Sequence, residues 1–132
     1  MQKAVSSERA AVDAVIRIDG QRDRNLLVNL AVTTPRRDTI FFQASRFRVP
    51  ASGIGTVTIP IELESPTLWN GVENPYLYNV IVKVTDQNVT CDSLAVPLGL
   101  RYFSVDPKTG FALNGRPLQL HGVFYYEDRA SV

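Results

Sequence analysis

Carboxylate pairs are the first candidates for chemistry in this sequence, because two carboxyl groups that converge on one bond can act as general acid and general base. Glu62 and Glu64 lie two residues apart, on the polar side of an alternating run. Glu127 and Asp128 are neighbours, and the side chains of neighbouring residues on an extended chain point apart. We therefore interpret the first pair as a solvated surface pair, and we predict no catalytic pair in this chain.

Nucleophile and metal chemistry also lack a complete set of residues. His121 is the only histidine, and Ser6, Ser7 and Ser104 are not near it in sequence, so a serine triad is not predicted. Cys91 is the only cysteine, which excludes an internal disulfide and a multi-cysteine zinc site. We expect Cys91 to be a small packing residue and His121 to be an interior or interface residue. No metal and no cofactor is predicted.

The composition excludes several functional classes. The chain has 132 residues, with 14 Lys plus Arg against 13 Asp plus Glu and a net charge of +1. This balance argues against nucleic-acid binding by phosphate neutralisation, and no apolar run is long enough to span a membrane. The first residues lack the apolar core of a signal peptide, so the compartment is undecided, and a periplasmic or cytoplasmic bacterial protein is the expectation.

A period of two predicts that nearly all the elements that would position these residues are strands. Apolar and polar residues alternate over Val12–Ile18, Leu26–Val32, Val57–Leu63 and Tyr76–Val84. Further strands are expected within Thr39–Val49, where Phe41-Phe42 obscures the register, and within Thr90–Leu98 and Leu100–Val105. Pro60 predicts an edge strand or a bulge. Short strands with turn signals about 8–12 residues apart predict an all-β, immunoglobulin-like antiparallel β-sandwich, with a β-barrel as the alternative.

The C-terminal part of the chain predicts a hairpin and strand appendage. Asn114-Gly115 is a strong two-residue turn signal between the short apolar runs on either side of it. The following run, Leu118–Tyr126, is almost entirely apolar, which is typical of a strand buried on both faces. Nothing after this run could cover it, so we expect the chain to end inside a larger fold.

Two segments of the chain carry a resemblance to a known family. The first is Leu68-Trp69-Asn70-Gly71-Val72-Glu73-Asn74-Pro75-Tyr76-Leu77-Tyr78, and the second combines Gly99–Phe103 with Gly110–Val123. In this order and spacing they resemble the central immunoglobulin-like domain of glycoside hydrolase family 2, which includes β-galactosidases, β-glucuronidases and β-mannosidases. The resemblance implies a sandwich over residues 1–105. It also implies that residues 106–132 are a linker, a hairpin and the first-strand remnant of a (β/α)8 catalytic barrel.

The resemblance also implies a longer parent enzyme, in which a jelly-roll domain and the barrel are the partners of this chain. Members of the family retain anomeric configuration and take both catalytic carboxylates from later barrel strands. The 132-residue chain alone is therefore expected to be inactive, with carbohydrate bound only through the parent, and β-galactosides are the leading substrate. Glu127 and Asp128 are substrate-rim candidates, and the expected structural anchors are Trp69, Pro75, Tyr76, Tyr78, Arg101, Asn114 and Gly115.

Two other functions stay open at this point: a free-standing carbohydrate-binding module and a cell-surface interaction domain of sandwich fold. Trp69 could stack on a sugar ring in the first of these, but the shaped loop marked by Pro66, Asn70-Gly71 and Pro75 favours an anchor. The apolar tail is predicted either to be unsettled or to pair with a second copy of the chain, because its strand neighbours are missing.

Overall fold

The computed structural model describes residues 2–20, 23–51 and 53–122, and every regular element in this part of the chain is a β-strand. The all-β prediction is therefore confirmed. Among the described residues, no helix has the length and apolarity needed to cross a membrane. The strands are β1 (Gln2–Val5), β2 (Arg9–Gly20), β3 (Arg24–Thr33), β4 (Thr39–Val49), β5 (Gly53–Glu64), β6 (Tyr78–Asp86), β7 (Val89–Leu98), β8 (Phe103–Asp106), β9 (Gly110–Leu113) and β10 (Arg116–Pro117).

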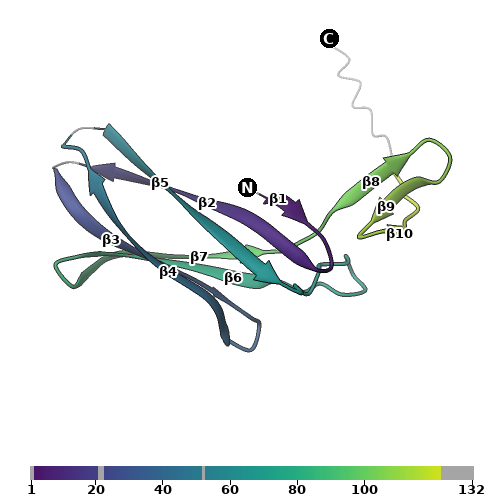
Figure 1. The fold of residues 1–132 in the computed structure, drawn as a ribbon, viewed down its shortest axis with the longest axis horizontal. Coiled ribbons are helices and arrows are strands. Elements are labelled where there is room, and N and C mark those ends of the chain that lie inside the picture. Colours follow the sequence, from purple (N-terminus) through teal and green to yellow (C-terminus); the bar gives the residue numbers. More distant parts are fainter. Residues whose placement is uncertain (1, 21–22, 52, 123–132) are drawn as a thin grey trace, which may run out of the picture.

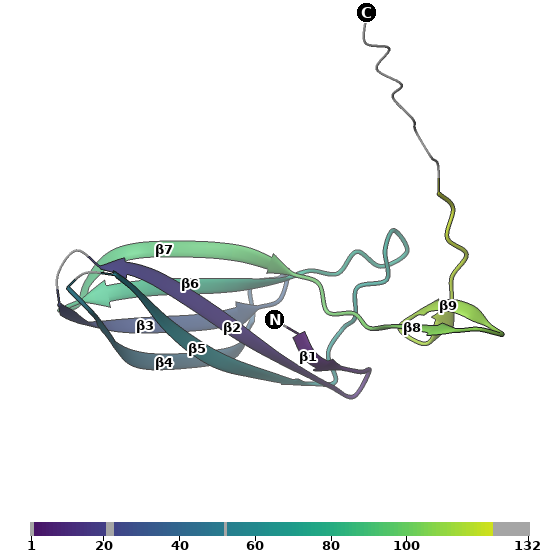
Figure 2. The ribbon, with the colours of Figure 1, turned by 90° about the horizontal axis from the view of Figure 1, so that it is seen from above.

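The seven N-terminal strands form two antiparallel sheets that stack as a sandwich (Figures 1 and 2). One sheet has the strand order β1-β2-β5, and the other has the order β4-β3-β6-β7. The register is continuous along β2 and β5, from Arg9 opposite Glu64 to Gly20 opposite Gly53. This arrangement confirms the predicted antiparallel sandwich.

Alternation along the strands places one apolar face of each sheet in the core. Full burial of one such aliphatic side chain contributes about 1.5–3 kcal/mol to stability relative to leaving it exposed. The buried apolar residues come from β2, β3 and β5, together with the ends of β4 and β6 and the segment after β7. They are Ala10, Val12, Leu26, Val28, Leu30, Val32, Val49, Ile59, Ile61, Leu63, Tyr78, Val84 and Leu100.

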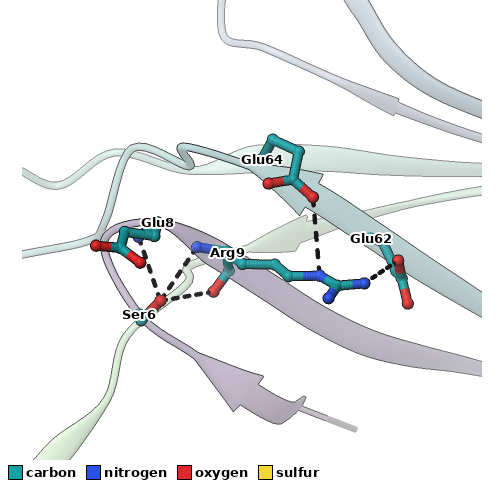
Figure 3. A network of polar contacts seen from close by, with 5 residues as sticks. All are labelled: Ser6, Glu8, Arg9, Glu62 and Glu64. Atoms are coloured by element: carbon teal, nitrogen blue, oxygen red, sulfur yellow. Dashed lines mark hydrogen bonds and ion pairs between the residues drawn. The ribbon is translucent and has the colours of Figure 1, made fainter.

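The prediction from Pro60 is also confirmed, because β5 is an outer strand of its sheet. On the solvent face of β5, Glu62 and Glu64 flank the guanidinium of Arg9 from the neighbouring strand (Figure 3). The two carboxylate side chains are 58% and 80% exposed. Their position confirms the predicted solvated surface pair. The two carboxylates pair with an exposed cation, the guanidinium of Arg9.

A small third sheet follows the sandwich, with the strand order β10-β9-β8. Asn114 and Gly115 connect β9 to β10 with positive φ values of 50° and 77°, as a type I′ turn requires. The predicted hairpin is therefore present. The strand expected over Leu100–Val105 instead begins at Phe103 and pairs with β9, so it joins this sheet and not the sandwich. The boundary between domains at residue 105 stays a prediction.

The strand expected over Leu118–Tyr126 was predicted as part of a larger barrel, and it stays a prediction. Residues 118–122 form no strand, and the side chains of Leu118 and Leu120 are 45% and 68% exposed. The N–H of Leu118 donates to the carbonyl of Phe111 in β9 at 2.9 Å, but the pairing of β10 with β9 ends at Pro117. Residues 123–126 lie outside the described residues.

Candidate functional site

The predicted anchors meet at one end of the sandwich. We use "the junction" for the loop of residues 65–77, the segment of residues 99–102 and the Asn114-Gly115 turn. The loop connects β5 to β6, and the segment leads from β7 to β8, so both leave the sandwich at the same end (Figure 2). The turn comes from the small sheet, and its contacts with the loop join the two parts of the chain.

Trp69 is held in the junction by both its backbone groups. Its N–H donates to the carbonyl of Leu100 at 2.8 Å, and its carbonyl accepts a hydrogen bond from Asn114 Nδ2 at 3.0 Å. The guanidinium carbon of Arg101 lies 5.0 Å from the centre of the indole, within cation–π range. A Cβ atom on Gly99 would lie 3.4 Å from Trp69 Cβ and Cγ, so the backbone there passes closely under the side chain. The side chain of Trp69 is half-buried.

Asn114 makes four hydrogen bonds in the junction, two to Tyr102 and two to the loop. Its backbone N–H donates to the carbonyl of Tyr102 at 2.9 Å, and its Oδ1 accepts from the Tyr102 N–H at 3.0 Å. Its Nδ2 donates to the Trp69 carbonyl and also to Oδ1 of Asn70. One amide side chain therefore connects three segments that lie far apart in sequence.

Two further junction residues were not singled out from the sequence. Asn70 accepts from Asn114, and its N–H donates to the carbonyl of Asn74 at 2.8 Å, which closes the tip of the loop. Tyr102 supplies the backbone partners of Asn114, and its hydroxyl would lie 3.2 Å from a Cβ on Gly115. The paired asparagines in the loop were a visible signal, but only the fold shows which amide they meet.

Tyr76 and Tyr78 anchor the other end of the loop. Tyr78 is buried, and its hydroxyl accepts a hydrogen bond from the N–H of Thr67 at 2.8 Å. The two tyrosine rings meet edge to face, with 5.0 Å between their centres. Burial is the main cause that raises the pKa of the Tyr76 hydroxyl above its usual value. Pro75, immediately before them, is exposed.

The remaining candidates for chemistry are dispersed. Among the described residues, no group of three or more His, Cys, Asp and Glu side chains could hold a metal ion. Cys91 is exposed, so the expectation of a packing cysteine is wrong. His121 is exposed as well, which excludes an interior position in the described structure and leaves its placement at an interface a prediction. Cys91 lies on β7, whose residues the facing sheet leaves almost entirely exposed. Glu127 and Asp128 lie outside the described residues.

A carboxylate shapes the turn that leads into the junction hairpin. Asp106 Oδ1 accepts hydrogen bonds from the N–H groups of Lys108 and Thr109, each at 2.8 Å. These backbone donors, that of Thr109 first, lower the pKa of the Asp106 carboxyl below its usual 3.8. The turn between β8 and β9 is therefore stabilised by a carboxylate, and the described residues of the junction contain no acid–base pair.

We predict that the turn over residues 106–110 loosens only in strong acid. Because the pKa of Asp106 is lowered by folding, its contribution is fully present above the usual value of 3.8 and is lost as pH falls through the lower folded value. Carboxyl chemical shifts in a pH titration should show a midpoint for Asp106 below the usual 3.8. In Asp106→Asn, the amides of Lys108 and Thr109 should show no such acid transition. A midpoint for Asp106 at or above 3.8 would contradict this prediction.

Comparison with family models and comparison with individual proteins identify the same family. The family model described as "Glycosyl hydrolases family 2" matches residues 2–101. A β-glucuronidase of Bacteroides fragilis is 32% identical over 132 residues, which is 100% of this chain and 19% of that protein. A β-galactosidase of Bacteroides ovatus is 37% identical over 71 residues, which is 54% of this chain and 8% of that protein.

Solved structures share the fold. The crystal structure of a β-glucuronidase from Bacteroides uniformis superposes with a TM-score of 0.85, at 21% identity. The match covers 93% of this chain and 15% of that one. The present chain thus spans about a fifth of the length, or less, of the proteins that it resembles.

Proposed function

Because the chain belongs to glycosyl hydrolase family 2, we propose that it is the non-catalytic sandwich of a longer retaining, exo-acting β-glycosidase. In this proposal, residues 1–105 are the sandwich domain, and residues 106–132 lead into a (β/α)8 catalytic barrel. A jelly-roll domain would precede the sandwich. The chain would hold the barrel in position, and the chemistry would be done by carboxylates of that barrel.

The junction is the observation that carries this proposal. It fixes the small sheet to the end of the sandwich through the hydrogen bonds of Asn114 and Trp69, so whatever follows β10 starts from a set position. Such bonds would be of little use to a free-standing module, whose C-terminal strands need no defined direction.

The small sheet also presents an apolar surface, and this surface is evidence for a neighbouring domain that covers it. Phe103 and Val105 on β8 are 68% and 72% exposed, and the Phe103 ring stacks on Phe111 with 5.9 Å between centres. Leu118 and Leu120 are also exposed, and they line a hollow together with Phe111. Contiguous exposed apolar groups of this kind mark surfaces that another domain covers. Glu127 and Asp128 follow in the sequence, and they stay proposed substrate-rim residues.

The sugar at the active site of the parent is the finer part of the proposal. Galactosides are the substrate expected from the resemblance, and a relative matched over 54% of the chain is named a β-galactosidase. The relative matched over 100% of the chain is named a β-glucuronidase. We therefore propose a β-linked terminal galactoside or glucuronide as the substrate.

The coding sequence downstream of Val132 tests this proposal. We expect it to encode a barrel with two carboxylates about 5 Å apart, the separation of retaining enzymes. The extended protein should hydrolyse nitrophenyl β-galactoside or nitrophenyl β-glucuronide, and the 132-residue chain should hydrolyse neither. Comparison of the two rates identifies the sugar.

Two results would overturn the proposal. One is a downstream sequence without a barrel. The other is hydrolysis by the 132-residue chain that Glu127→Gln abolishes and Glu73→Gln, the matched change in the exposed loop, leaves unchanged. Either result would move the function of this chain away from positioning a catalytic domain.

A further inference from the structure

An apolar groove runs along one open side of the sandwich. β1 pairs with β2 only as far as Gln2 opposite Val12. In the described part of the chain, residues 14–20 of β2 have a strand neighbour on the β5 side alone. On the facing sheet, β7 is an outer strand. The groove between these two edges has a volume of about 690 Å³.

The walls of the groove are the inward faces of β2 and β7, and inward faces of a sandwich are normally buried in its core. Ile16 and Ile18 on β2 are only half-buried, although residues of the same face nearer β1, such as Val12, are buried. Across the groove, the register sets Leu94 and Val96 of β7 opposite Val82 and Val80, on the inward face of their sheet. Leu94 and Val96 are nevertheless 60% and 46% exposed. The facing sheet is one strand too narrow to cover them.

We infer that the groove is filled by one more strand, antiparallel to β2, formed by the segment directly preceding Gln2 in the longer protein. This inference rests on the proposed function, because only a longer parent supplies that segment. The direction of β1 supports it. Val5 lies opposite Ala10 and Gln2 opposite Val12, so the chain traced backwards runs along β2 into the groove. Figures 1 and 2 show β1 covering only one end of β2.

The geometry also specifies the chemistry of this segment. Residues 14–20 span roughly 23 Å at about 3.3 Å per residue, so a segment of about seven residues fills the edge. Its inward side chains must be apolar to cover Ile16, Ile18 and Leu94. Its other side chains lie beside Arg17 and Asp19 on the solvent face and must be polar. A slip of one residue would reverse the two faces, so the alternation sets the register.

Amide hydrogen exchange tests the inference directly. We would compare the 132-residue chain with the same chain carrying about ten of its natural upstream residues, enough to pair with residues 14–20. The extension should slow exchange of the outward-facing backbone amides of residues 14–20 at least tenfold and raise the melting temperature. Amides of β4, on the far edge of the other sheet, should keep their rates and serve as the internal control. Unchanged rates in β2 would overturn the inference.

A matched pair of variants separates strand docking from a general gain in stability. Leu94→Thr changes a groove residue that is already largely exposed, so the unextended chain should fold normally. In the extended chain it should remove most of the protection gained by residues 14–20. Ala95→Thr, the neighbouring position on the opposite face of β7, should keep that protection. Equal effects of the two variants would overturn the inference.

The remaining outcomes distinguish this inference from the proposed function. If the unextended chain is a dimer with residues 14–20 already protected, a second copy fills the groove, and the inference is overturned. If the upstream segment protects β2 but no barrel is encoded downstream, the inference stands and the proposed function fails. If the longer protein is an active barrel enzyme but its upstream segment leaves β2 unprotected, the proposed function stands and the inference fails.

Discussion

Replacing Asn114 with alanine is expected to detach the small sheet from the sandwich while the sandwich itself stays folded. The change removes the side-chain bonds to Tyr102, Trp69 and Asn70. It also leaves alanine at a φ of 50°, a left-handed conformation that costs a residue with a Cβ roughly 1–2 kcal/mol. With about 0.5–1.5 kcal/mol for each lost hydrogen bond, docking should weaken by about 3–5 kcal/mol.

Hydrogen exchange of the amides in β8, β9 and β10 measures this effect. In Asn114→Ala these amides should exchange at least 30-fold faster, while the amides of β3 keep their rates. Asn88→Ala is the matched control, because Asn88 also has a left-handed φ of 70°, in the turn between β6 and β7. The side chain of Asn88 is exposed. Similar protection of the small sheet in both variants would contradict the role of Asn114.

The second large effect is expected in the core, where Leu30→Ala should lower the free energy of unfolding by about 3–5 kcal/mol. Leu30 lies on β3, a strand with neighbours on both sides, and its side chain is 0% exposed. Truncation leaves a cavity between the sheets that the flanking strands are too constrained to close. Urea unfolding followed by the fluorescence of Trp69 would measure the loss.

Leu94→Ala provides the matched control for the core, since it removes the same atoms from a side chain that is 60% exposed. It should change the free energy of unfolding of the 132-residue chain by less than about 1 kcal/mol. If the two variants lost similar stability, the assignment of Leu30 to the centre of the core and of Leu94 to an uncovered face would be wrong.

Most strands and turns of the sandwich follow from short-range patterns in the sequence, above all the alternation of apolar and polar residues. The alternating runs that include Leu26–Val32 and Val57–Leu63 became β3 and β5, because a period of two allows only one apolar face per strand. Asn114-Gly115 formed the expected turn, since it requires positive φ at both positions. Pro60 marked an outer strand because proline has no N–H to donate to a neighbour. Each of these signals acts within a few residues of the structure that it determines.

The interpretations that went wrong concern exposure. Cys91 was expected to be a packing residue, and it is exposed. Phe41-Phe42 could not be oriented, and pairing with β3 turned Phe41 toward the core and left Phe42 63% exposed. Whether a side chain is buried depends on the element that packs against it. The sequence of one strand does not determine how many strands the facing sheet has.

For the site, the sequence by itself determined the types of residue that meet, including Trp69, Arg101 and Asn114, through their resemblance to a family pattern. Only the tertiary structure decided that the Asn114 amide bonds the loop at Trp69 and Asn70, and that β7 faces an open groove. The physical reason is distance along the chain. Asn114 and Asn70 are separated by 44 residues, so only the folded arrangement of the sheets brings their side chains within hydrogen-bond distance. Local alternation can direct each strand, but contacts of this kind depend on how the finished sheets come together.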